Sequence, residues 1–157
     1  MGINEYKITE SMALEAMSKK KFGTLPMWSQ TKEDPIEFDT ECALVDKDGV
    51  GLQATFGALY RRGVKVKFEK IKCTMFGTYP RKHRIYEIDN GDELSFKKKK
   101  GVSHASAHEH IGNKRINRND MNGCTMGQYL QEAQKKCNIS LNLEEFDDLS
   151  PENFLLK

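Results

Sequence analysis

Residues 41–60 read ECALVDKDGVGLQATFGALY and have the pattern of a β-hairpin. An apolar run over 41–45 leads into the polar segment DKDG at 46–49, where Gly49 suits a turn position that requires a positive φ. The run from Val50 to Tyr60 supplies the returning strand. This hairpin predicts an antiparallel sheet in the middle of the chain.

More strands are predicted after this hairpin. Residues 64–68, VKVKF, alternate apolar and charged side chains, which is the period of a half-buried strand. The apolar series continues at Ile71 and Cys73 with the opposite parity, so a β-bulge is expected near residues 69–70. Further strand candidates are residues 83–89, 94–98 and 102–111. We therefore expect a sheet of about five or six antiparallel strands.

Helices are predicted on both sides of this sheet. The first runs from Thr9, a suitable N-cap, to Lys21, with Gly23 beyond its end. The polar stretch 26–35 predicts a loop. Residues 125–128, TMGQ, form a capping box that opens a helix ending near Asn138, and the Ser-Pro pair at 150–151 predicts a short last helix.

At 157 residues and 18.0 kDa the chain has the size of one domain. Helices at both ends of a central antiparallel sheet make an α+β fold. The expected parts are an N-terminal helix in 1–24, a loop in 25–40, a basic antiparallel sheet in 41–118 and a C-terminal helical part in 119–157.

The composition excludes several classes of protein. Hydrophobic residues make up 38% and charged residues 31%, no apolar run has the length of a membrane span, and the first residues lack a signal-peptide pattern. We therefore expect a cytoplasmic protein without a membrane partner. The four cysteines include no C-x-x-C pair, and Cys42 and Cys73 occupy apolar strand positions, so inert free thiols are expected.

The net charge of +2 hides an uneven distribution. Residues 61–118 hold 16 Lys and Arg against 6 Asp and Glu, whereas the rest of the chain holds 9 against 17. An excess of positive charge in one region attracts polyanions such as nucleic acids. If the acidic flanks fold back onto this region, they neutralise it instead.

Residues 101–112, GVSHASAHEHIG, are the one local cluster that suggests chemistry. Side chains alternate between the two faces of a strand, so an extended segment places His104, Ser106, His108 and His110 on one face. Three interpretations of this face compete.

In the first interpretation, two imidazoles act as base and acid in the cleavage of RNA through its 2′-hydroxyl, because both protonation states of imidazole are available near neutrality. This interpretation needs no cofactor. In the second, a divalent transition metal is bound by His108 and His110, with His104 or a distant carboxylate as the third ligand. The cupin pattern does not fit, because Lys114 and Arg115 stand where its Glu ligand is needed. In the third, the histidines are structural or bind a partner only.

Residues 84–90, RIYEIDN, precede this segment. An Arg and Asp-Asn strand followed by a His-rich strand with H-x-H resembles the small bacterial TumE-type toxins and related uncharacterised families. The resemblance covers residues 84–112. It implies a compact cytoplasmic protein of a mobile element or a toxin–antitoxin module, with a cognate antitoxin as a possible partner.

The function expected from the sequence is that of an RNase-like toxin that acts on nucleic acid. The expected catalytic residues are His108 and His110, with His104 as a third participant. The expected substrate contacts are Arg84, Lys100, Ser106, Lys114 and Arg115. One alternative is an anti-defence inhibitor of a phage or mobile element, which binds a defence-system protein or another nucleic-acid-handling partner without catalysis. A second alternative is a metal-dependent enzyme that uses the same histidines.

Overall fold

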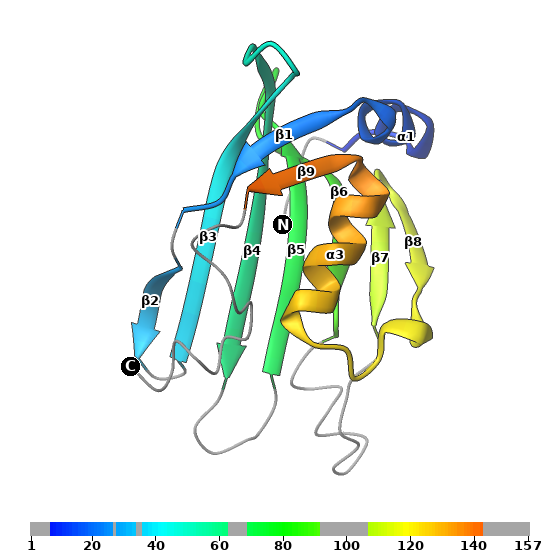
Figure 1. The fold of residues 1–157 in the computed structure, drawn as a ribbon. Coiled ribbons are helices and arrows are strands. Elements are labelled where there is room, and N and C mark those ends of the chain that lie inside the picture. The colour runs from blue at the N-terminus through cyan, green and yellow to red at the C-terminus, as the bar shows by residue number, and fades with distance from the viewer. Residues whose placement is uncertain (1–6, 27, 34–35, 63–68, 92–106, 143–157) are drawn as a thin grey trace.

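The computed structural model describes residues 7–26, 28–33, 36–62, 69–91 and 107–142. In chain order these residues form α1 (Glu10–Ser18), β1 (Lys21–Thr24), β2 (Ser29–Glu33), β3 (Ile36–Val45), β4 (Gly51–Arg62), β5 (Glu69–Gly77), β6 (His83–Asp89), β7 (His108–Ile111), β8 (Lys114–Asn117), the 3-10 turn η1 (Asn119–Met121), α3 (Met126–Cys137) and β9 (Ile139–Asn142). The fold is α+β (Figure 1).

The described strands form one sheet of nine strands in the order β8-β7-β6-β5-β4-β3-β1-β9, with β2 paired to β3. Every pair is antiparallel except β1 and β9, which run parallel with Lys21 opposite Ile139. In Figure 1, β1 and β9 cross in front of β4 and β5. The sheet is therefore strongly curved at the end formed by β1 and β9, and these two strands lie across β4 and β5.

The two α-helices of the described residues, α1 and α3, pack on the same face of the sheet. α1 contacts β6 and β7, α3 contacts β5 and β6, and the two helices contact each other (Figure 1). The core lies between them and the sheet, with Phe56, Met75, Tyr86 and Leu130 fully buried. No described helix covers the opposite face of β3–β8, which we call the open face.

Three features predicted from local sequence signals are present, namely the β3–β4 turn, the capping box of α3 and the end of α3 near Asn138. The β3–β4 hairpin turns at residues 46–49, where the Asp46 amide donates to the Val50 carbonyl at 2.9 Å and Gly49 has a φ of 81°. The Thr125 hydroxyl and the Gln128 side chain form the expected capping box. Asn138 ends α3 in the left-handed conformation.

The first helix is shorter than predicted, because α1 ends at Ser18 and Lys21 begins β1. The buried Lys21 Nζ donates to the carbonyls of Met17 and Cys137, at 3.1 and 2.6 Å, and so joins the ends of the two helices. Gly23 lies inside β1 rather than ending a helix. A Cβ there would lie 2.9 Å from Cys42 Sγ, so this glycine allows the close approach of β1 to β3.

The prediction of five or six strands is too low. The predicted loop at 25–40 contains β2 and the start of β3, and the predicted helical part at 119–157 contains β9. Glu69 and Lys70 pair in regular register with β4, and the irregularity in β5 lies at Met75–Phe76 instead. The candidate strands at 64–68 and 94–98, residues 102–106 and the candidate helix at 150–151 lie outside the described residues.

Candidate functional site

β7 directs its side chains alternately to the two faces of the sheet. Glu109 and Ile111 are buried on the helix side, whereas His108 and His110 are half-buried on the open face. The two imidazole rings meet edge to face, with their centroids 5.0 Å apart and an angle of 89° between their planes. One strand thus holds two titratable rings side by side on an open surface.

The strand register extends this pair into two rows of side chains across the open face, because residues directly opposite each other in antiparallel strands share a face. The first row is Glu41, Gly57, Thr74, Glu87, His110 and Arg115. The second row is Asp39, Leu59, Lys72, Asp89, His108 and Asn117.

The two carboxylates next to the histidines are already hydrogen-bonded. Glu87 accepts from the Thr74 hydroxyl at 3.1 Å and from Arg84 Nη1 at 3.3 Å. Asp89 is paired with Lys70 and accepts from the Gly91 amide at 2.7 Å. These contacts compensate the two negative charges within the sheet.

His110 is held in its neutral form. Burial and the nearby positive groups of Arg84, His108 and Arg115 lower the pKa of His110 to about 4, and the opposing effect of Asp89 is smaller. At neutral pH this imidazole therefore accepts a proton or a hydrogen bond at its free nitrogen. It is suited to be a base rather than an acid.

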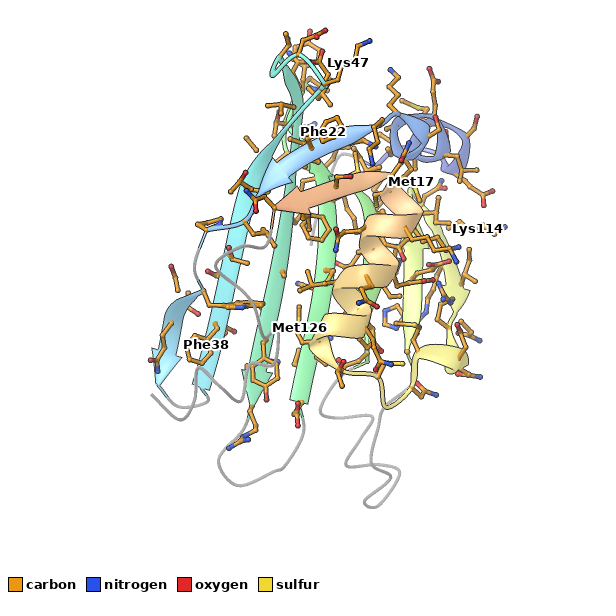
Figure 2. All side chains as sticks on the ribbon, viewed as in Figure 1. Met17, Phe22, Phe38, Lys47, Lys114 and Met126 are labelled. Atoms are coloured by element: carbon orange, nitrogen blue, oxygen red, sulfur yellow. The ribbon has the colours of Figure 1, made fainter. Side chains whose placement is uncertain are left out.

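The structure brings some of the predicted site residues together and separates others. Arg115 lies opposite His110 on β8, and Arg84 bonds Glu87, which lies opposite His110 on β6. Lys114 lies at the β8 edge (Figure 2) on the helix side, where its Nζ is 3.1 Å from Glu10 Oε2. Its side chain therefore does not reach the histidine pair. Lys100, His104 and Ser106 lie outside the described residues.

The open face also carries functional candidates that the sequence analysis missed. Glu87 and Asp89 are themselves buried, but they alternate with the apolar Tyr86 and Ile88, so the period of β6 could have placed both carboxylates on one face. Lys72 and Thr74 lie opposite Asp89 and Glu87 through the pairing of β5 with β6, and no local pattern in the sequence predicts this register. Within the described part of the chain, no group of three or more His, Cys, Asp or Glu side chains is arranged to hold a metal ion.

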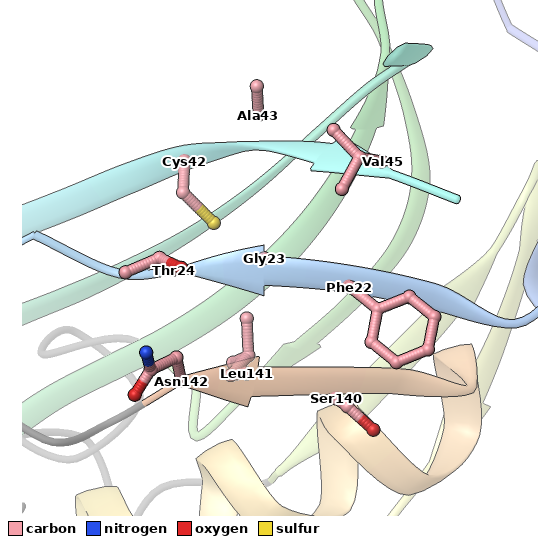
Figure 3. A pocket seen from close by; sticks show the side chains of 9 residues that line it. All are labelled: Phe22, Gly23, Thr24, Cys42, Ala43, Val45, Ser140, Leu141 and Asn142. Atoms are coloured by element: carbon pink, nitrogen blue, oxygen red, sulfur yellow. The ribbon is translucent and has the colours of Figure 1, made fainter. Parts of the chain in front are cut away.

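A separate depression of about 520 Å³ lies where β1 meets β3 and β9 (Figure 3). The Cys42 sulfur points toward β1 at Gly23, and burial raises the pKa of this thiol to about 11. A protonated thiol is a poor nucleophile. Cys42 is therefore not a candidate nucleophile in this depression.

Among the described residues, no helix has the length and apolar character needed to cross a membrane. Comparison with known proteins gives no match to a family model, to a curated protein or to a solved structure. The chemistry of the open face is therefore inferred from its side chains alone.

Proposed function

We propose that the open face around β7 binds RNA and cleaves it, with His110 and His108 as the catalytic pair. One observation carries the proposal: two imidazoles lie 5.0 Å apart on the open face, Arg115 lies opposite His110, and Arg84 bonds Glu87 on the other side of His110. Imidazole pairs suit proton transfer near neutral pH, and arginine suits the binding of phosphate. This combination favours the cleavage of a phosphodiester.

The lowered pKa of His110 assigns the two roles. His110, neutral at pH 7, takes the proton of the RNA 2′-hydroxyl, and the resulting oxygen attacks the adjacent phosphorus. His108 gives a proton to the departing 5′-oxygen. The P–O bond to that oxygen breaks, and the products are a 2′,3′-cyclic phosphate and a new 5′-hydroxyl.

Arg84 and Arg115 are the proposed contacts to the phosphate. Negative charge builds up on its oxygens in the transition state, and preformed positive groups stabilise that charge. Arg84 is held by its 3.3 Å contact to Glu87, while Arg115 lies exposed on β8 opposite His110. His104, Ser106 and Lys100 remain proposed participants from the segment that precedes β7.

The proposed biological setting follows from the resemblance of residues 84–112 to TumE-type toxins. In that setting the chain is a cytoplasmic RNase-like toxin whose activity is checked by a cognate antitoxin. The excess of Lys and Arg over residues 61–118 supports a polyanionic substrate.

The test is cleavage of single-stranded RNA by the full chain and its His108→Ala and His110→Ala variants. Each variant should lose about 10²–10⁴-fold in cleavage rate and still bind RNA. His83→Ala is the matched control, because the His83 ring lies against Gly77, away from the pair. This control should cleave at the normal rate, and a chelator should leave the activity unchanged.

Other outcomes would overturn the proposal. If the double histidine variant cleaves RNA at the normal rate, His108 and His110 are not the catalytic pair. Loss of activity with a chelator, together with stoichiometric bound metal, would favour the metal-dependent enzyme. If the chain cleaves no RNA and binds a partner protein with the same affinity in the unchanged chain and in the histidine variants, the anti-defence inhibitor is favoured.

A further inference from the structure

A cavity of about 380 Å³ lies on the open face, and β6 separates it from the histidine strand β7. Gly57, Leu59, Phe76, Asp39, Glu41 and Lys72 contribute to its lining, from strands β3, β4 and β5. Its volume falls in the range of sites that hold small ligands or parts of larger ones. The lining combines apolar surface with both signs of charge.

Gly57 leaves the middle of this cavity without a side chain. It lies inside β4, between Glu41 of β3 and Thr74 of β5. A Cβ at Gly57 would make only ordinary contacts, 3.4 Å from the Thr40 carbonyl oxygen and 3.5 Å from Glu41 Oε1, so the Glu41 carboxylate borders this position. Packing therefore does not require a glycine here. Glycine inside a strand often marks a place where a ligand approaches the backbone closely.

The charged groups of the cavity fit a ligand with both donors and acceptors. Asp39 and Lys72 lie on either side of Leu59 in one row across the sheet. Neither has an ion-pair partner among the residues that the structure describes. Lys82 is otherwise engaged, because its Nζ lies 3.2 Å from Glu41 Oε1 and 4.3 Å from the centre of the Phe76 ring.

We infer that this cavity binds a guanine base of the RNA substrate, an inference that rests on the proposed function. A carboxylate can accept two parallel hydrogen bonds, and guanine offers two neighbouring N–H donors next to its O6 acceptor. Asp39 would accept from the donors and Lys72 would donate to O6. Leu59 and Phe76 would pack against the ring, with the Gly57 backbone and the Glu41 side chain at its border.

The position of the cavity relative to the histidines suits this assignment. Thr74 lines the cavity, its hydroxyl donates to Glu87, and Glu87 lies opposite His110. The middle of the cavity, at Gly57 and Leu59, lies on β4, three strand spacings or about 14 Å from β7. A guanine in the cavity would thus belong to a nucleotide close to the cleaved phosphodiester.

The first test measures binding of guanosine 5′-monophosphate and uridine 5′-monophosphate to the full chain by calorimetry. Gly57→Val fills the cavity, and Gly51→Val is the matched control, because Gly51 lies on the same strand with no atom within 4 Å of an added Cβ. The guanosine nucleotide should bind the unchanged chain and the control at least about tenfold more tightly than Gly57→Val. The uridine nucleotide should bind at least about tenfold more weakly than the guanosine nucleotide.

Asp39→Asn keeps the shape of the cavity and removes its acceptor charge, so it provides a second variant if Gly57→Val does not fold. It too should weaken binding of the guanosine nucleotide. Equal binding to the unchanged chain and to folded Gly57→Val, or to Asp39→Asn, would overturn the inference. So would equal affinity for the two nucleotides.

Two further measurements separate this inference from the proposed function. The His108→Ala, His110→Ala double variant should still bind the guanosine nucleotide. If the unchanged chain binds this nucleotide but cleaves no RNA, the proposed function alone is overturned. An RNA with one guanosine should be cut beside it, and the free nucleotide should compete. Histidine-dependent cleavage with no preference for guanosine would overturn the inference and leave the proposed function standing.

Discussion

Glu109, the residue between His108 and His110, accepts a hydrogen bond of 2.8 Å from the buried hydroxyl of Tyr86. Its carboxylate is only 2% exposed and also accepts from Arg118 Nη1 at 2.8 Å. Lys136 of α3 approaches its other oxygen at 3.6 Å. The histidine pair thus stands on a strand whose opposite face is tied to β6 and α3 by a buried charge.

Replacing this charge should destabilise the fold. We expect Glu109→Leu to lower the free energy of unfolding by about 3 kcal/mol or more, because it removes the partner of buried donors. Urea denaturation measures this loss. Tyr86→Phe removes one neutral donor only and should cost about 1 kcal/mol. Equal losses in the two variants would show that the ionic contacts of Glu109 contribute little.

The pKa of His110 should respond to Arg115. Removing a positive neighbour makes protonation easier, so Arg115→Gln should raise the pKa of His110 from about 4. The acidic limb of the RNA cleavage rate should move to higher pH in the same variant, because His110 acts there as the base. NMR titration of the imidazole protons measures the pKa directly.

Lys114→Gln is the matched control for Arg115→Gln. The two residues are adjacent, but Lys114 lies on the helix side of β8 and Arg115 lies opposite His110. The control should leave the titration of His110 unchanged. The same shift in both variants would mean that long-range charge, rather than the contact across β7 and β8, sets the pKa.

Local signals in the sequence predicted the features that depend on neighbouring residues. The turn at 46–49 and the capping box at Thr125 each need only a few consecutive side chains, and both are present. The pairing of Lys21 with Ile139 joins distant parts of the chain, and no local pattern indicates it. For this reason β1 and β9 were missed and the strand count was too low.

The features of the candidate site also fall into two groups, those that a local pattern predicts and those that depend on long-range strand pairing. The period of a strand was enough to place His108 and His110 on one face, and residue type alone nominated Arg84, Lys114 and Arg115. The turn after Ile111 decides which side chains of β8 share a face with the histidine pair. It therefore also decides that Arg115, rather than Lys114, lies next to the pair. The cavity at Gly57 depends on the register of three strands, which the sequence does not reveal.

Lys21 should make stability depend on pH in the alkaline range. Burial lowers its pKa to about 8, whereas an unfolded chain keeps the ordinary value near 10.5. Between these values the unfolded state binds more protons, so the free energy of unfolding should rise with pH, by up to about 3 kcal/mol. Urea denaturation at several pH values measures this slope.

Lys21→Met should remove this slope, because the side chain no longer titrates. Lys20→Met is the control, since Lys20 is exposed and bonds Ser140 Oγ at 2.6 Å. It should keep the slope of the unchanged chain. A slope that survives in Lys21→Met would have to come from another group and would contradict this account of the buried ammonium.

Gly112 should be the least replaceable residue of the turn between β7 and β8. It has a φ of 59°, and a Cβ there would lie 2.4 Å from the carbonyl oxygen of Thr9. Thr9 caps α1, so its backbone cannot give way without disturbing that helix. Gly112→Ala should therefore cost stability through both strained backbone and collision.

Gly123→Ala separates these two causes. Gly123 has a φ of 79° but no atom within 4 Å of an added Cβ, so its replacement should cost about 1–2 kcal/mol from backbone strain alone. Gly112→Ala should lose clearly more in urea denaturation, and it should lower RNA cleavage because the turn positions His110 and Arg115. Equal losses of stability would show that Thr9 moves aside freely, and the contact between α1 and the β7–β8 turn would then have no part in holding the histidine strand in place.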